Sequence, residues 1–88
     1  MGVGKTRELA ISKQAHEFIL SLPANQRQKI KQAVTRILVG DFEGLDIKKL
    51  HPHPHDFRLR VGGVRVLFTS EPHRLFIFKA GFRGDVYR

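Results

Sequence analysis

The sequence contains no cysteine among its 88 residues, so neither disulfide bonds nor cysteine-ligated zinc can stabilise the fold. It also lacks any run of about 18 consecutive apolar residues, the length that a membrane-spanning helix needs. The N-terminal residues show no apolar segment of the kind that a secretory signal carries. We therefore expect a cytoplasmic protein of a reducing compartment with no membrane partner.

Acidic residues are scarce: 8 Asp and Glu stand against 16 Lys and Arg, which gives a net charge of +8 and a pI near 10.7. The basic excess is spread along the chain and is not confined to one tail. An excess of this size favours polyanionic partners through electrostatic steering and counterion release. Composition alone leaves nucleic acid, an acidic membrane surface and an acidic protein open as partners.

The spacing of apolar residues predicts a single domain, residues 1–88, of the α+β class with the order β-α-α-β-β-β. We expect two N-terminal helices to pack on a mostly antiparallel twisted sheet. Residues 75–80 read as a central strand covered on both faces, and the pairing of the first strand is left open. The predicted elements are a strand at 7–11, helices at 12–22 and 24–39, a loop at 40–55, and strands at 56–61, 64–69 and 75–80.

The most informative segment is the hairpin around Gly62-Gly63, because a Gly-Gly pair between two β-rich runs is a strong two-residue turn signal. The predicted register places Arg60 opposite Arg65, with Arg58 on the same face. Like charges opposite each other cost up to about 1 kcal/mol. Only eight acids exist in the chain, so we expect them not to neutralise all three arginines. The hairpin therefore predicts an anion-binding face.

Two further groups of residues are candidates for contact with nucleic acid. Arg83 and Tyr87 follow the last predicted strand, and a tyrosine beside guanidinium groups suits stacking on a base. Lys29, Lys31 and Arg36 lie on the outer face of the second predicted helix, where they form either a solvated surface or an RNA contact.

Three histidines, His51, His53 and His55, alternate with prolines just before the hairpin. A structural zinc site needs four ligands that converge tetrahedrally, and the prolines keep this stretch extended. We therefore predict no metal site here, and we assign His55 a possible RNA contact because its loop adjoins the arginines.

The second half of the chain, residues 45–88, resembles the RelE branch of the RelE/ParE toxin superfamily. Residues 57–68 match the hairpin pattern Tyr/Phe-Arg-x-Arg-x-Gly-x-x-Arg-x-x-Phe/Tyr, and residues 81–88 match the closing Gly-x-Arg…Val-Tyr element. The first half agrees only in pattern. The resemblance implies a toxin of a type II toxin–antitoxin system that cleaves mRNA in the ribosomal A site without metal or other cofactor. It implies attack of the 2′-hydroxyl on the adjacent phosphate, and three partners: a RelB-like antitoxin that is acidic or carries an amphipathic helix, 16S ribosomal RNA and A-site mRNA.

The resemblance also implies catalytic roles for five residues. Arg58 and Arg60 fall where the RelE branch has two catalytic lysines, Arg65 and Arg83 on its catalytic arginines, and Tyr87 on its C-terminal tyrosine. Because arginine does not act as a base, the 2′-hydroxyl proton is left either to electrostatics alone or to Tyr87, with a histidine at 53 or 55 as a weaker candidate.

Two other functions compete with this interpretation. One is a ParE-like toxin that inhibits DNA gyrase through protein contacts, and the other is a non-catalytic basic RNA-binding domain. The retained arginines and the tyrosine favour the RelE branch, because protein binding alone needs no phosphate-gripping face.

Overall fold

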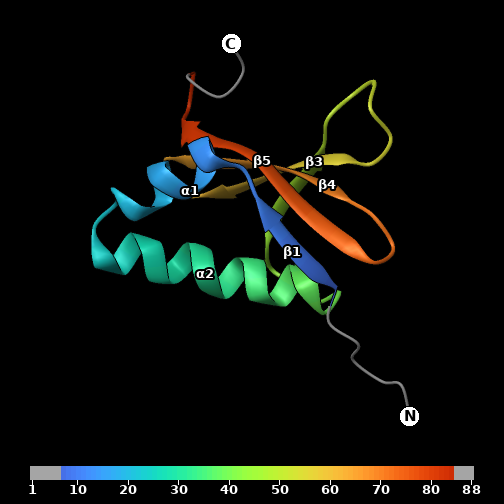
Figure 1. Ribbon diagram of the computed structural model, residues 1–88, viewed down its shortest axis with the longest axis horizontal. Coiled ribbons are helices and arrows are strands. Elements are labelled where there is room, and N and C mark those ends of the chain that lie inside the picture. Colours follow the sequence, from blue (N-terminus) through green and yellow to red (C-terminus); the bar gives the residue numbers. More distant parts are fainter. Residues whose placement is uncertain (1–6, 85–88) are drawn as a thin grey trace.

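The computed structural model describes residues 7–84 of the chain, and these residues form two layers. Helices α1 (Lys13–Leu20) and α2 (Ala24–Leu38) cover one face of a five-stranded sheet (Figure 1). The predicted α+β class and the order of a strand, two helices and then strands are confirmed. No helix in the described part of the chain is long and apolar enough to cross a membrane. The strands are β1 (Glu8–Ile11), β2 (Asp46–Lys49), β3 (Asp56–Val61), β4 (Val64–Ser70) and β5 (Arg74–Phe82).

Local sequence signals set the ends of the helices. The Ser12 hydroxyl caps α1 by accepting a hydrogen bond from the Ala15 amide at 3.1 Å. Helix α1 ends at Leu20, two residues before the predicted end, because the chain turns there and places Leu22 in the core. Pro23 occupies the N-cap position of α2, where its fixed φ of −57° suits the helix start.

The sheet has the strand order β1-β5-β4-β3-β2. Strand β1 pairs with β5 in parallel, with Ile11 opposite Ile77, and the other neighbours pair antiparallel. The pairing of the first strand, which the sequence did not fix, thus joins segments more than 60 residues apart. A parallel pair needs a long crossover connection, and the helices together with β2, β3 and β4 provide it.

The prediction that residues 40–55 form a loop is wrong, because β2 (Asp46–Lys49) pairs antiparallel with β3. The strand has four residues, and Ile47 is its single apolar side chain. Charged side chains on a short edge strand discourage pairing with other molecules. They also leave no alternation of apolar residues from which the strand could be predicted. The sheet therefore has five strands where the sequence predicted four.

The hairpin of β3 and β4 has the predicted register, with Val61 opposite Val64 and Arg60 opposite Arg65. Gly62 adopts a φ of +59° and Gly63 does not have a positive φ, as in a type II′ turn with glycine at its first central position. A residue with a Cβ atom is strained at Gly62, so the turn depends on this glycine.

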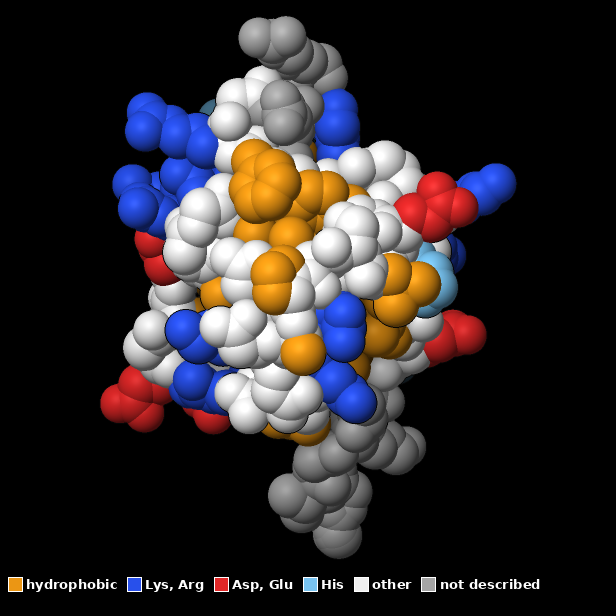
Figure 2. Space-filling view, turned by 90° about the vertical axis from the view of Figure 1, so that its left-hand side faces the viewer, with side chains coloured by type: hydrophobic (Ala, Val, Ile, Leu, Met, Phe, Trp, Pro, Cys, Tyr) orange, Lys and Arg blue, Asp and Glu red, His pale blue; other side chains and the backbone are white. Residues whose placement is uncertain are grey.

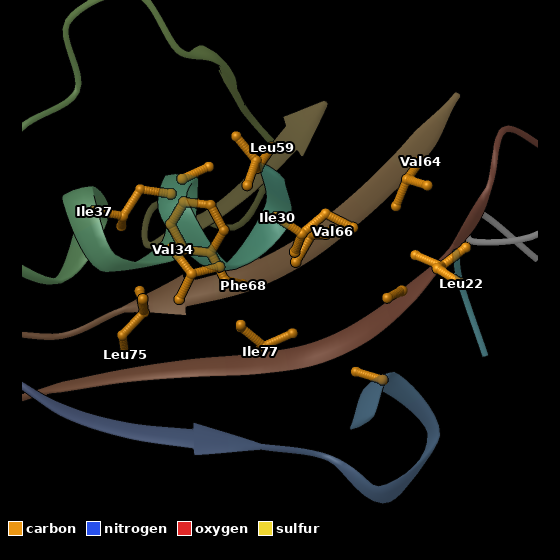
Figure 3. Packing of buried hydrophobic residues seen from close by; sticks show 13 residues of the cluster. Leu22, Ile30, Val34, Ile37, Leu59, Val64, Val66, Phe68, Leu75 and Ile77 are labelled. Carbon is orange, nitrogen blue, oxygen red and sulfur yellow. The ribbon is translucent and has the colours of Figure 1, made fainter. Parts of the chain in front are cut away.

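The hydrophobic core lies between the helices and the sheet (Figure 3). From α2, Ile30, Val34 and Ile37 point at the sheet, and all three are buried. The sheet side of the core consists of Leu59, Val64, Val66, Phe68, Leu75, Ile77 and Ala80. In the hairpin, Leu59, Val64 and Val66 thus lie in the core, on the face opposite the three arginines.

Strand β5 lies inside the sheet, but the prediction that both of its faces are covered is wrong. Leu75 and Ile77 are buried against the helices, whereas Phe76 and Phe78 on this strand are only half-buried. Their rings contact each other with centroids 6.3 Å apart, and the Arg74 guanidinium lies 5.1 Å from the Phe76 ring centroid. No helix or strand of the described chain covers this face of β5, so neighbouring side chains partly shield the two aromatic rings from solvent.

Two polar side chains join distant parts of the fold. Arg7 donates to the Ile37 carbonyl at the end of α2 (2.7 Å) and to the Ser70 hydroxyl at the end of β4 (2.6 Å). The Gln14 side chain of α1 bonds both the amide and the carbonyl of Ala80, at 3.0 and 2.6 Å. Because β1 ends opposite Ile77, Gln14 satisfies β5 backbone groups that no strand reaches.

Candidate functional site

The candidate site is the arginine face, by which we mean Arg58, Arg60 and Arg65 on the face of the sheet opposite the helices. Their strand neighbours Leu59, Val64 and Val66 point into the core, so alternation directs the three arginines to the other side. The structure thus brings together the three hairpin arginines as predicted. Figure 2 shows Lys and Arg side chains in several separate groups on one side of the molecule, so charge alone does not locate the arginine face.

Arg65 lies on β4, the middle strand of the sheet, and is only 6% exposed. Its Nη1 donates to the Gly62 carbonyl at 3.4 Å, and among the described residues no carboxylate lies within 4.0 Å of its guanidinium. A buried charge without an ionic partner is costly unless it binds an anion. Arg65 is therefore buried where, among the described residues, its guanidinium has only a long hydrogen bond to a neutral carbonyl.

Arg60 converges on the same carbonyl from the neighbouring strand. Its Nε lies 3.5 Å from the Gly62 carbonyl oxygen, and its side chain is 51% exposed. Two guanidinium groups thus share one neutral acceptor at the hairpin turn, and an anion entering from solvent meets Arg60 first. Bidentate binding of phosphate by guanidinium groups suits this arrangement.

Arg58 differs from the other two because it has an acidic partner. Its Nη2 donates to Asp46 Oδ1 at 2.6 Å, while its Nε is buried without a hydrogen-bond partner. Asp46 Oδ2 also lies 4.0 Å from Arg60 Nε. The other nearby acid, Asp56, accepts from the Thr69 hydroxyl at 2.7 Å instead. The expectation that acids of this chain do not neutralise all three arginines holds for the described residues, since Asp46 serves two of them and Arg65 has none.

Arg83 follows β5 at the same end of the sheet as the hairpin turn. Its amide donates to the Gly63 carbonyl at 3.3 Å, and Gly81 of the same strand lies opposite Arg65. The backbone of Arg83 is therefore close to the turn on which Arg60 and Arg65 converge. Tyr87 lies outside the described residues.

The basic residues of α2 lie on the other side of the molecule. Lys29 and Lys31 are exposed on the helix surface that faces away from the sheet. Arg36 binds Asp41 at 3.0 Å and the Glu43 carbonyl, and thereby anchors the loop after the helix. The hydrogen bond from Arg36 lowers the pKa of Asp41, and the same bond raises the pKa of Arg36. The structure does not bring these three residues together with the arginine face, and their contact with RNA stays a prediction.

His55 is exposed and precedes β3 at the end of the hairpin away from Gly62. Arg60 lies five positions further along the chain, or about 17 Å along an extended strand. His55 is therefore distant from the convergence of Arg60 and Arg65, and its predicted role in RNA binding is untested. No group of three or more potential metal ligands occurs within residues 7–84.

Sequence reasoning missed Asp46, the residue that links the arginine face to β2. Asp46 lies opposite Arg60, and Lys48 lies opposite Arg58, in the register of β2 and β3. The alternating segment Asp46-Ile47-Lys48 just before the hairpin was the available signal, but it is shorter than the runs that periodicity detects. Because ionised arginine neither gives up nor accepts a proton, the chemistry that the three arginines can supply is binding and orientation of an anion through fixed positive charge.

No protein-family model matches the sequence, and a search of the curated proteins finds no match. Solved structures do match the fold. A chain of the RelE–RelB complex from Pyrococcus horikoshii is 23% identical, with a TM-score of 0.78 over 91% of this chain and 98% of that chain. A chain of the RelB–RelE complex from Methanococcus jannaschii is 20% identical, with a TM-score of 0.75 over 89% and 94%. The YoeB dimer from Staphylococcus aureus is 17% identical, with a TM-score of 0.74 over 90% and 99%.

The strand order and the arginine face define a small α+β domain in which no helix of residues 7–84 covers the basic face of the sheet. More particularly, the chain has the fold of the RelE toxin structures, along nearly its whole length. The resemblance that the hairpin sequence indicated is thus confirmed for the fold.

Proposed function

We propose that this protein is the toxin of a type II toxin–antitoxin system and an endoribonuclease that cleaves mRNA in the ribosomal A site. The observation that carries the proposal is the buried, acid-free Arg65 opposite Arg60 on a RelE-type sheet. Two like charges opposite each other lower the stability of the fold, and binding of a phosphate between them offsets this loss. The solved RelE neighbours that are complexed with RelB support an antitoxin partner.

The proposed reaction is an internal transesterification at one phosphate of the message. The 2′-oxygen of the preceding nucleotide forms a bond to phosphorus, and the bond from phosphorus to the 5′-oxygen breaks. The 2′-hydroxyl gives up its proton, the leaving 5′-oxygen takes up a proton from water, and the products are a 2′,3′-cyclic phosphate and a 5′-hydroxyl. Negative charge gathers on the non-bridging oxygens and on the leaving 5′-oxygen, so fixed cations aimed at those atoms stabilise the transition state.

The arrangement of the arginines supports separate roles. The buried Arg65 clamps the scissile phosphate, while the exposed Arg60 guides it inward and stabilises the developing 2′-alkoxide. Arg83, beside the hairpin turn, stabilises the leaving 5′-oxygen, and Arg58 adds positive charge next to Arg60. Tyr87 is proposed on sequence grounds alone as the residue that stacks on the base or accepts the 2′-hydroxyl proton.

The proposal includes the partners and the location that the resemblance implies. The ribosome, through 16S ribosomal RNA, presents the A-site message in the geometry that cleavage needs, and a RelB-like antitoxin neutralises the toxin in the cytoplasm. The catalytic arginines act without a metal ion in this scheme.

Primer extension on message in a reconstituted translation system tests the proposal. Wild type is compared with Arg65→Gln and Arg83→Gln, and Arg74→Gln serves as a matched control because it removes the same charge from an exposed site at the other end of β5. We expect cuts on translated message only, with losses of about 100-fold in the two site variants and near wild-type cleavage in the control.

Other outcomes of this experiment separate the competing functions. Absence of cuts together with inhibition of DNA gyrase indicates a ParE-like toxin. Absence of cuts together with salt-sensitive RNA binding indicates a non-catalytic RNA-binding domain. Either outcome overturns the proposed ribonuclease.

A further inference from the structure

Asp46 is an unexpected acid on a surface otherwise suited to anions. Its carboxylate bridges two arginines, with Oδ1 at 2.6 Å from Arg58 Nη2 and Oδ2 at 4.0 Å from Arg60 Nε. Within residues 7–84 it is the one carboxylate that forms an ion pair with the arginine face. The two oxygens of a carboxylate held between guanidinium groups resemble two oxygens of a phosphate.

The setting of Asp46 distinguishes it from a structural ion pair. It is the first residue of β2, an edge strand of four residues, and its side chain is 45% exposed. Arg58, by contrast, is only 12% exposed, and its Nε is buried without a partner. An exposed carboxylate on a short edge strand exchanges its partner at little cost, whereas loss of an anionic partner without replacement costs more at the mostly buried Arg58.

We propose that Asp46 is an internal substitute for an RNA phosphate: it occupies Arg58 and Arg60 in the free protein, and a backbone phosphate of bound RNA displaces it. This inference rests on the proposed function, since it takes the arginine face as the surface that binds RNA. The consequence is a specific one: the acid lowers affinity for RNA in general, so that tight binding requires a substrate presented in the right geometry. Removing its charge strengthens binding, although it takes away a contact within the site.

The test measures binding of a short 2′-O-methyl RNA oligonucleotide, which cannot be cleaved because its 2′-oxygens are blocked. Fluorescence anisotropy gives the Kd for the wild type and for Asp46→Asn at several salt concentrations. We expect Asp46→Asn to bind about fivefold tighter, the upper range of effects for an exposed ion pair. The plot of log affinity against log salt becomes steeper by about 0.7, because the displaced Asp46 carboxylate of the wild type takes up a cation that offsets one cation released from the RNA, and Asp46→Asn has no such carboxylate.

Asp41→Asn is the matched control. Asp41 also pairs with an arginine, its side chain is 51% exposed, and its substitution changes the net charge equally, but it lies beside α2 away from the arginine face. We expect this variant to bind RNA like the wild type. Equal tightening in both variants indicates overall charge alone and overturns the inference, as does weaker binding by Asp46→Asn. Asp46→Glu keeps the charge and is expected to keep the wild-type Kd.

A second measurement uses the wild-type protein and so does not depend on the folding of a variant. The side-chain carboxyl carbon of Asp46 and the guanidinium nitrogen signals of Arg58 are followed by NMR during titration with the same oligonucleotide. Displacement predicts that both signals shift together, and a shift of Arg58 alone contradicts it. Because the probe cannot be cut, loss of the proposed ribonuclease activity leaves this inference standing, and failure here leaves the ribonuclease untouched.

Discussion

We expect Arg65 to serve anion binding while it lowers the stability of the fold. Arg65→Met tests its effect on stability. The substitution keeps a long side chain on β4 but removes the buried charge that lies opposite Arg60. Relief of the like-charge pair contributes up to about 1 kcal/mol. Replacement of a buried ion by an apolar side chain contributes about 1 kcal/mol more, the low end of the known range. Loss of the 3.4 Å bond to the Gly62 carbonyl costs about 0.5–1 kcal/mol, since that exposed carbonyl keeps Arg60 and water as partners.

The net expectation is that Arg65→Met raises the free energy of unfolding by about 1 kcal/mol, which corresponds to a rise in Tm of about 4–8 °C for a domain of this size. Urea denaturation followed by circular dichroism measures the change, with an unchanged m-value as the sign that both states are comparable. Arg74→Met is the matched variant of opposite sign, because Arg74 is exposed and stacks on Phe76, a contact worth about 0.5–1 kcal/mol. Destabilisation of 1 kcal/mol or more by Arg65→Met would refute the view that this arginine is kept for binding.

Three further predictions concern the frame around the site. Arg7→Ala should lower the free energy of unfolding by about 2 kcal/mol, because it removes charge-assisted bonds between the end of α2 and the end of β4; chemical denaturation measures this, and a change near zero contradicts it. Gly62→Ala should cost about 1 kcal/mol because the turn needs a positive φ, and the same measurement with Gly63→Ala, where φ is not positive, should show less. Because the hydrogen bond from Arg36 lowers the pKa of Asp41, this bond stabilises the folded state at pH values above the pKa of an ordinary carboxyl group. The stabilisation is lost as the pH falls through the pKa of Asp41 in the folded state. An NMR titration should therefore show the pKa of Asp41 rise toward its usual value in Arg36→Gln, and an unchanged pKa would contradict the role of that bond.

The parts of the fold that follow from local patterns could be predicted from the sequence. The hairpin register followed from the Gly-Gly turn and strict alternation, so the shared face of Arg58, Arg60 and Arg65 was predictable residue by residue. The predicted start of the first helix at residue 12 agrees with the cap that Ser12 forms in the structure. These signals act over a few residues and do not depend on the rest of the chain.

The parts that were missed depend on contacts between distant segments. Strand β2 has too few apolar residues to be predicted from its sequence pattern. It forms by pairing with the edge of β3. Asp46 entered the site only through that pairing, twelve residues away from Arg58. Arg36 read as a surface cation, yet it anchors the loop after α2 through Asp41. A sequence pattern shows which residues share a strand face, but not which charge from another segment meets them.

The central claim is that the arginine face grips the phosphate at which the message is cut. The most direct test is the single-turnover rate of cleavage on ribosomes programmed with a defined A-site codon, together with analysis of the RNA ends. The account predicts a 2′,3′-cyclic phosphate and a 5′-hydroxyl from the wild type, a rate lowered about 100-fold by Arg65→Gln, and a rate nearly unchanged by Arg74→Gln. Equal rates for all three proteins, or no cleavage by folded wild type, would contradict it.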